Sequence, residues 1–368
     1  SIGVTRALAS ARKMDFRSDN VASVAPEIMA AIAAANAGPA AGYGDGEISQ
    51  RLEPAYSELF ETDVRVFPVL TGTIANSLSA AVLSPPWGAI YAETNAHINQ
   101  DECGGPEFFT GGAKTLPLEG INGKIKAEDL QRAVDAGPKG FVHAAQPAAL
   151  SLTQSSEAGS IYSVAEIAEL SAIAHGANLK VHMDGARFAN AVVALNEGIQ
   201  SCSPADITWR AGVDVLSFGA TKNGALGAEA IILFRTELAD EMAFRHKRAG
   251  QLASKMRYIS AQLEAYIKDG LWLRMAEHAN RMCWALADGM GAFAGVRIDA
   301  FGGANELFVE FPGATVIALR EQGFEFYDWP ETAAAGPDKR CTIRLVTRHD
   351  TTPRDVNSIV AAVKKLAV

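Results

Sequence analysis

The chain has 368 residues, which is more than one hydrophobic core usually covers, so we expect two domains of unequal size. Its hydrophobic content of 48% and charged content of 20% are typical of a globular enzyme. The formal net charge is −9 and no block is rich in Lys or Arg, which argues against nucleic acids and anionic membranes as partners.

Four widely spaced cysteines form no CxxC pair, which predicts free thiols in a reducing cytoplasm and no metal site: Cys103, Cys202, Cys283 and Cys341. No window is long and apolar enough to span a bilayer. Residues 1–13 lack the long apolar region of a signal peptide, so we expect an extension before Met14 or a remnant of an expression vector.

Between residues 64 and 234, short runs rich in β-forming residues alternate with helical patterns. The predicted strands are VRVFPVL (64–70), AIYAE (89–93), KTLPLE (114–119), GFVHAAQ (140–146), NLKVHMD (178–184), VDVLSFG (213–219) and AIILF (230–234). Helices are predicted between most of them, for example at 73–83 and 164–176. Several strands are almost wholly apolar, so this order predicts a mainly parallel sheet between two helical layers.

The C-terminal third has a different pattern. Helical spacing continues from residue 237 to 290, and strands at 296–300, 305–311 and 341–347 precede a final helix at 353–366. We therefore expect a large α/β domain at 22–252 and a small α+β domain at 253–368, joined by a long helix.

Lys222 lies in FGATKNGALGAEA (218–230), among residues with very small side chains. Taken alone, it is an ordinary loop lysine in solvent. The alternative is an amine that forms a Schiff base with a carbonyl such as that of pyridoxal phosphate. Gly219, Gly224 and Gly227 would then let a flat ring approach the backbone.

Asp184 ends the predicted strand NLKVHMD, at the edge where open α/β sheets bind their ligands. It is either a turn residue or a carboxylate that keeps a pyridine nitrogen protonated. Arg187 follows three residues later, and its planar guanidinium could hold a carboxylate.

Two further segments follow predicted strands. LTGTIANSL (70–78) turns at Gly72 and Thr73 into a helix whose first N–H groups suit a phosphate. His97 follows AIYAE and is either structural or an imidazole that stacks on a ring and exchanges protons near neutral pH. The GxSxG, HExxH and GxxxxGK[ST] motifs are absent, which argues against serine hydrolases, zinc peptidases and P-loop enzymes.

In this order the motifs resemble one family, the threonine aldolase branch of the fold-type I pyridoxal-phosphate enzymes, and especially its low-specificity L-threonine and phenylserine aldolases. The matching segments are DFRSDNVAS (15–23), AGYGDGE (41–47), LTGTIAN (70–76), AHINQDECGG (96–105), HMDGARFANA (182–191), SFGATKNGALG (217–227) and TIRLVTRHD (342–350). The resemblance implies a three-layer α/β fold like that of aspartate aminotransferase. Its mainly parallel sheet has seven strands, its C-terminal domain is small, and residues 14–21 lie near the active site.

The resemblance also implies the cofactor, pyridoxal 5'-phosphate, and the residues that surround it. Lys222 would carry the cofactor covalently, Asp184 would bind its pyridine nitrogen, and His97 would stack on its ring. Gly72 and Thr73 would bind its phosphate.

Other residues would bind the substrate or lie at a subunit boundary. Ser18, Arg187 and Arg344 match positions that hold the substrate carboxylate, and Arg187 also borders the cofactor. Arg257 would reach the phosphate in a partner subunit, and Tyr43 would lie at the rim of the site. The resemblance therefore implies a homo-oligomer, a dimer or a tetramer, with its active site at the subunit interface.

One segment departs from the family pattern. Many members have ENTHN, with a histidine near the substrate hydroxyl, whereas this chain has LTQSSEAGS (152–160), with Ser155 or Ser156 near that place. The base that deprotonates the β-hydroxyl is therefore open, and His97 or a water held by it is the candidate. The implied reaction is retro-aldol cleavage of L-β-hydroxy-α-amino acids, such as phenylserine, threonine or allo-threonine, to glycine and an aldehyde. A β-eliminating lyase or racemase of the same fold is the alternative.

Overall fold

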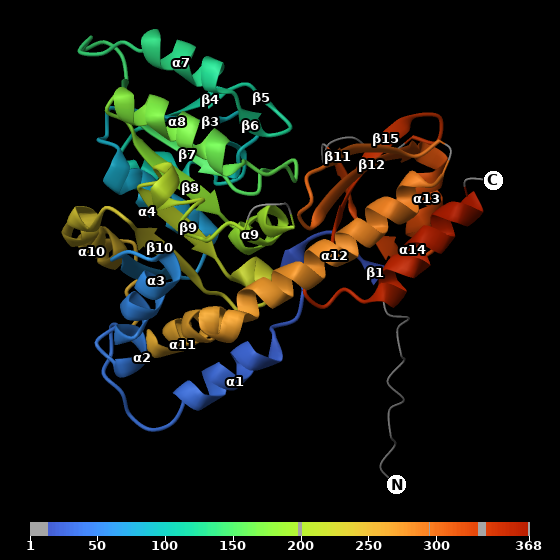
Figure 1. Ribbon diagram of the computed structural model, residues 1–368, viewed down its shortest axis with the longest axis horizontal. Coiled ribbons are helices and arrows are strands. Elements are labelled where there is room, and N and C mark those ends of the chain that lie inside the picture. The colour runs from blue at the N-terminus through green and yellow to red at the C-terminus, as the bar shows by residue number, and fades with distance from the viewer. Residues whose placement is uncertain (1–13, 198–200, 294, 330–335, 367–368) are drawn as a thin grey trace.

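The computed structural model describes residues 14–197, 201–293, 295–329 and 336–366. They form a large unit around a seven-stranded sheet and a smaller unit around a four-stranded sheet, with one long helix running between them (Figure 1). The expected extension at 1–13 lies outside the described residues. Within the described ranges, no helix is long and apolar enough to cross a membrane.

The large sheet consists of β2 (Arg65–Val69), β3 (Gly88–Glu93), β4 (Lys114–Leu118), β7 (Gln146–Thr153), β8 (Lys180–Gly185), β9 (Val215–Gly219) and β10 (Glu229–Leu233). Their spatial order is β2-β10-β9-β8-β7-β3-β4. Neighbouring strands are parallel except around β10, which runs antiparallel to β2 and β9. The predicted seven-stranded, mainly parallel sheet is confirmed.

Helices cover both faces of this sheet. One face packs against α3 (Leu52–Phe60), α7 (Ala127–Asp135), α8 (Val164–Gly176), α9 (Phe188–Asn196) and α11 (Arg257–Ile267). Leu152, Met183 and Phe218 belong to that core. The other face packs against α4 (Gly72–Leu83) and α10 (Ala239–Arg248), where Ile90 and Ile231 are buried. The strands are apolar on both sides because both sides are covered, which gives the predicted three layers.

Local capping explains why two helices begin where the sequence predicts. The Thr71 hydroxyl accepts the N–H of Ile74 at 3.3 Å and starts α4. Ser163 and Glu166 form a capping box that starts α8. The remaining short elements of the large unit are α1 (Pro26–Ala35), α2 (Glu47–Gln50), α5 (His97–Gln100), α6 (Gly105–Thr110), β5 (Gly120–Ile121) and β6 (Lys124–Ile125).

The strand predicted at 140–146 is wrong. Residues 140–145 form turns, and the strand β7 begins only at Gln146. The side-chain amide of Gln146 donates to three carbonyls of the preceding loop, those of Pro138, Phe141 and Ala144. These bonds and a φ of 74° at Gly140 hold the apolar FVHAA segment in a loop.

The smaller sheet has the antiparallel order β11 (Arg297–Phe301), β12 (Glu306–Pro312), β15 (Arg340–Val346) and β14 (Tyr327–Trp329). It shares a hydrophobic core with α13 (Gly313–Glu321) and α14 (Pro353–Leu366). The N-terminal strand β1 (Met14–Asp15) pairs with β13 (Phe324–Glu325), so residues from both chain ends build this unit.

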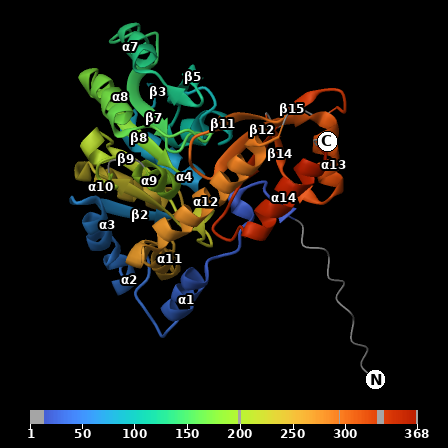
Figure 2. The ribbon, with the colours of Figure 1, turned by 45° about the vertical axis from the view of Figure 1, so that its right-hand side comes forward.

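The predicted helical stretch 237–290 is divided into three helices, α10, α11 and α12 (Leu271–Gly291). Helix α12 runs from the large unit into the small one (Figure 2). Trp272 and Met275 lie in the large core, whereas Cys283 and Leu286 lie in the small core. The two cores therefore meet within α12, and the division of the chain at residue 252 remains a prediction.

Candidate active site

A cavity of about 240 Å³ lies at the carboxyl ends of β8 and β9, against the N-terminus of α4. Five residues that the sequence predicts to bind the cofactor line it: Gly72, Thr73, His97, Asp184 and Lys222. They come from four segments that are distant in the chain, and open α/β sheets bind ligands at this edge. The fold thus brings the lysine, the aspartate and the helix N-terminus around one space.

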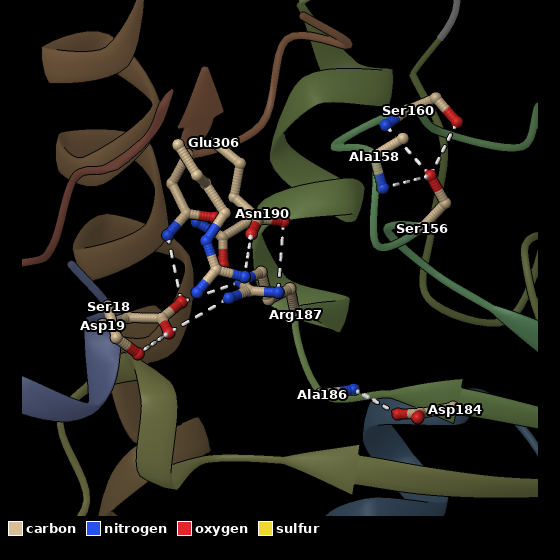
Figure 3. Close-up of polar contacts among 12 residues, drawn as sticks. Ser18, Asp19, Ser156, Ala158, Ser160, Asp184, Ala186, Arg187, Asn190 and Glu306 are labelled. Carbon is tan, nitrogen blue, oxygen red and sulfur yellow. Dashed lines mark hydrogen bonds and ion pairs between the residues drawn. The ribbon is translucent and has the colours of Figure 1, made fainter. Parts of the chain in front are cut away.

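Asp184 is buried and held in one orientation. Its Oδ1 accepts the N–H of Ala186 at 3.0 Å (Figure 3), and its Oδ2 accepts Nδ2 of Asn76 at 2.9 Å. Asn76 projects from α4, so the helix that begins at the cavity also positions the carboxylate.

Asn76 also connects Asp184 to a second hydrogen-bonded pair, which consists of Glu102 and His97. Its Nδ2 also lies 2.7 Å from Oε1 of Glu102, and the same oxygen lies 2.9 Å from Nδ1 of His97. The hydrogen bond to Glu102 raises the pKa of His97 against the opposing effect of burial, and the charge of Asp184 adds to the rise. Burial raises the pKa of Glu102, while hydrogen bonds from His97 and Asn76 lower it. The contact fixes the imidazole through Nδ1 and leaves Nε2 for the cavity.

Hydrogen bonds to neighbouring elements anchor the loop that contains Lys222. Nδ2 of Asn223 donates to the Tyr266 hydroxyl at 2.8 Å and to the Trp272 carbonyl at 2.9 Å. The buried Glu229 of β10 accepts the N–H of Ala220 at 2.8 Å. Burial raises the pKa of Glu229 to about 7, and hydrogen bonds and the Lys222 charge limit that rise. These contacts hold the Lys222 backbone against the sheet.

Contacts with other protein atoms explain why two positions of this loop are glycine, and the sequence did not reveal these contacts. A Cβ at Gly219 would lie 2.5 Å from the carbonyl oxygen of Ala186. Gly224 has a φ of 105°, and a Cβ there would lie 3.0 Å from Sδ of Met275. Protein atoms therefore require glycine at these two positions. Gly227 has no atom within 4 Å of its Cβ position.

Arg187 does not line the cavity but lies in a neighbouring buried cluster. Its Nε donates to Oδ2 of Asp19 at 2.8 Å, and its Nη1 lies 3.1 Å from Oε2 of Glu306 (Figure 3). Nη1 of Arg344 lies 3.9 Å from Oε1 of Glu306. Burial raises the pKa of Asp19, but the charges of Arg187 and Lys222 outweigh this effect and bring the pKa down to about 2. Arg187 thus contacts the carboxylates of both Asp19 and Glu306, and Arg344 contacts that of Glu306.

Three other predicted residues, Ser18, Tyr43 and Arg257, do not line the cavity. Ser18 accepts the N–H of Asn20 at 3.2 Å, and Asn20 itself lines the cavity. Tyr43 is 51% exposed on the loop at 36–47. Arg257 donates to the carbonyl of Gly38 in the same loop at 2.8 Å. Tyr43 and Arg257 therefore border one surface loop rather than this chain's cavity.

The serines at the position of the family histidine have different surroundings. Ser156 Oγ donates to the Asn122 carbonyl at 3.0 Å and lies 2.8 Å from Ser160 Oγ. Ser155 Oγ is buried, and it has no hydrogen-bond partner among the described residues. Ser156 is thus committed to the turn that follows β7.

Comparison with known proteins agrees with this geometry. A family model described as β-eliminating lyase matches residues 15–364. The low-specificity L-threonine aldolase of Pseudomonas aeruginosa is 40% identical over 312 residues, which cover 85% of this chain and 88% of the relative. The chain belongs to the threonine aldolase family. A second member, a low-specificity L-threonine aldolase of a Pseudomonas species, is 36% identical and covers 96% of this chain and 98% of its own length.

Solved structures of threonine aldolases have the same fold. The Leishmania major threonine aldolase superposes with a TM-score of 0.88 at 26% identity and covers 96% of this chain and 99% of its own. Serine palmitoyltransferase of S. paucimobilis, at 15% identity and a TM-score of 0.66, covers 96% of this chain and 87% of its own and supports the fold alone. The predicted fold-type I architecture is confirmed.

Pyridoxal 5'-phosphate is the cofactor of this threonine aldolase family member, as the sequence predicted. The cavity residues fit it. Lys222 supplies an amine, and Asp184 supplies a buried carboxylate in the same cavity. At the start of α4, Gly72 has no atom within 4 Å of its Cβ position, and the first N–H groups of a helix have no intrahelical acceptor.

Sequence reasoning missed the polar residues that orient this family's site. Asn76 and Glu102 lie within the quoted segments LTGTIAN and AHINQDECGG, and Asp19 lies within DFRSDNVAS. Glu229 and Glu306 stand in apolar strand patterns, AEAIIL and NELFVEF. A charged residue inside an apolar strand was the available signal, because such a residue is rarely buried without a partner.

Proposed function

We propose that the protein cleaves L-β-hydroxy-α-amino acids, including phenylserine, threonine and allo-threonine, to glycine and an aldehyde. The observation that carries the proposal is the single cavity that contains Lys222, Asp184 and His97 beside a helix N-terminus. The names of the Pseudomonas relatives support this substrate class. When bound, pyridoxal phosphate supplies an electron sink for the negative charge that develops at Cα.

The cavity residues bind and orient the cofactor. Lys222 carries it, and Asp184 keeps its pyridine nitrogen protonated, with the carboxylate fixed by Asn76. The N–H groups at Gly72 and Thr73, with the Thr73 hydroxyl, bind the phosphate at the positive end of α4.

Ser18, Arg187 and Arg344 bind the substrate carboxylate. The arginines lie 3.1 Å and 3.9 Å from one shared carboxylate, so their guanidinium groups are already arranged around a carboxylate-sized position. Holding the substrate there would set the angle of the breaking Cα–Cβ bond. Orientation of this kind can lower a barrier by several kcal/mol, of order ~7 kcal/mol in favourable cases.

His97 takes the proton of the β-hydroxyl group. Glu102 holds the imidazole through Nδ1 at 2.9 Å, so Nε2 is the atom that accepts the proton.

A homo-oligomer with shared sites is part of the proposal. Arg257 and Tyr43 border one surface loop, and from there Arg257 would reach the phosphate of a partner subunit. Mixing Arg257→Ala subunits with Lys222→Ala subunits tests this, because a hybrid would contain one site with both residues intact. Recovered activity supports sharing, and no recovery in confirmed hybrids refutes it. The four free cysteines also lead us to propose a cytoplasmic location.

The second candidate function is β-elimination, which the description of the matching family model favours. Incubation of the cofactor-loaded protein with phenylserine, threonine and allo-threonine decides between the two. Aldehyde and glycine in equal amounts support the aldolase, whereas ammonia with a keto acid and no aldehyde supports the alternative.

A further inference from the structure

A buried glutamate faces the predicted carboxylate site from the smaller sheet. Side chains alternate along β12, and Leu307 and Val309 belong to the core of the small unit. Glu306 therefore lies on the opposite face, which it shares with Arg344, because Arg344 pairs with Phe308 on that face. A Cβ at Gly159 would lie 3.4 Å from Cβ of Glu306, so the loop after β7 covers it.

The carboxylate of Glu306 lies between the two arginines. Oε2 is 3.1 Å from Nη1 of Arg187, and Oε1 is 3.9 Å from Nη1 of Arg344. The Glu306 side chain has 0% exposure, and neither oxygen has a hydrogen bond of good geometry among the described residues. Nε of Arg344 is likewise buried without a partner there. Buried polar atoms rarely lack partners in native structures, so this cluster is a candidate ligand site.

We propose that Glu306 occupies the carboxylate position between Arg187 and Arg344 in the substrate-free enzyme and must take up a proton when the substrate carboxylate binds. The inference rests on the proposed function, since it assumes that these arginines receive the α-carboxylate. Glu306 is thus a specificity-determining residue that acts through the arginines.

Charge balance in the buried cluster requires that Glu306 take up a proton when the substrate carboxylate binds. Arg187 and Arg344 contribute two positive charges, and Asp19 and Glu306 contribute two negative ones, so the buried cluster is neutral. A substrate carboxylate would add an uncompensated charge in a poorly solvated place, and protonation of Glu306 restores neutrality.

Charged groups on the neighbouring elements affect how readily Glu306 takes up a proton. Glu157, on the loop after β7, and Asp19 both oppose the ionised form of Glu306, whereas the two arginines favour it. Cys283 of α12 also faces it, with a thiol whose pKa burial raises. Burial raises the pKa of Glu306 to about 7, so proton uptake is accessible near neutral pH.

Calorimetric titration of the cofactor-loaded enzyme with glycine tests the proposal. Measurements at pH 6 to 9 in two buffers of different ionisation enthalpy give the protons taken up per glycine bound. We expect the wild type to take up close to one more proton above pH 7 than Glu306→Gln does. Above pH 7, the dissociation constant of the wild type for glycine should increase about tenfold per pH unit relative to that of the variant.

Two controls isolate Glu306. Glu310→Gln makes the same change four residues along β12, at a carboxylate paired instead with Arg297 and Arg340, and it should behave as the wild type. Glycinamide lacks the carboxylate, so its binding should show no uptake that depends on Glu306.

Equal proton uptake and equal pH dependence in the wild type and Glu306→Gln would overturn the inference. So would an effect of Glu306→Gln on proton uptake that is the same with glycine and with glycinamide. Aldehyde release from threonine or phenylserine is a separate measurement, so its absence counts against the proposed function while the proton count still reports on Glu306.

Discussion

The contact between His97 and Glu102 leads to a prediction about the pH dependence of catalysis. Glu102→Gln keeps the shape of the side chain and removes its charge. His97 acts as a base only when neutral, and its hydrogen bond to Glu102 is the largest cause that raises its pKa. Loss of the charge therefore lowers the pKa of His97, so the acidic limb of the kcat/KM profile should move to lower pH.

The structure sets the size of this shift. The contact measures 2.9 Å, and the Glu102 side chain has 0% exposure, so the hydrogen bond is shielded from water. A hydrogen bond to a charged group contributes about 1.5–3 kcal/mol, against about 1 kcal/mol for a neutral pair. The difference of about 0.5–2 kcal/mol corresponds to a shift of about 0.4–1.5 pH units. Asp184 and Glu157 continue to raise the pKa in the variant, so the shift should not greatly exceed that range.

The assay is aldehyde release from phenylserine or threonine between pH 5.5 and 9. Glu107→Gln is the matched control, because Glu107 bonds to Thr115 and the structure gives it no contact with His97. An acidic limb that stays within about 0.2 pH units of the wild type in Glu102→Gln would refute the reasoning. Persistence of the same limb in His97→Asn would remove His97 as the titrating base.

Three further predictions concern the lysine loop and the arginines. Lys222→Ala should abolish both the visible absorption of the bound cofactor and aldehyde release, and normal turnover would contradict its role. Arg344→Ala should raise KM at least tenfold with the cofactor still bound, and an unchanged KM would exclude it from carboxylate binding. Gly224→Ala should lower the free energy of unfolding by about 1–3 kcal/mol in urea, because of its φ of 105° and the contact with Met275. Gly176→Ala, at the end of α8, meets no atom within 4 Å and should not lower that free energy.

The sequence alone predicted the architecture and five of the residues that line the cavity. Apolar strands alternate with helical patterns, and periodicity of this kind is local, so it predicts six of the seven strands of the large sheet. Lys222 and His97 follow strands and Asp184 lies at the end of one, and the carboxyl ends of parallel strands meet at one edge. The seventh strand was misplaced because the apolar segment before Gln146 is held in a loop by side-chain bonds that no periodicity encodes.

Only the tertiary structure decided which polar residues hold that cavity in shape. Asn76 joins Asp184 to Glu102 across three segments, and Glu306 meets Arg187 across the two units. Such pairs depend on burial and on distances of about 3 Å between residues that are far apart in the chain, so spacing along the sequence cannot predict them. The motifs identified the chemical groups, and packing determined the partners that set their charge and orientation.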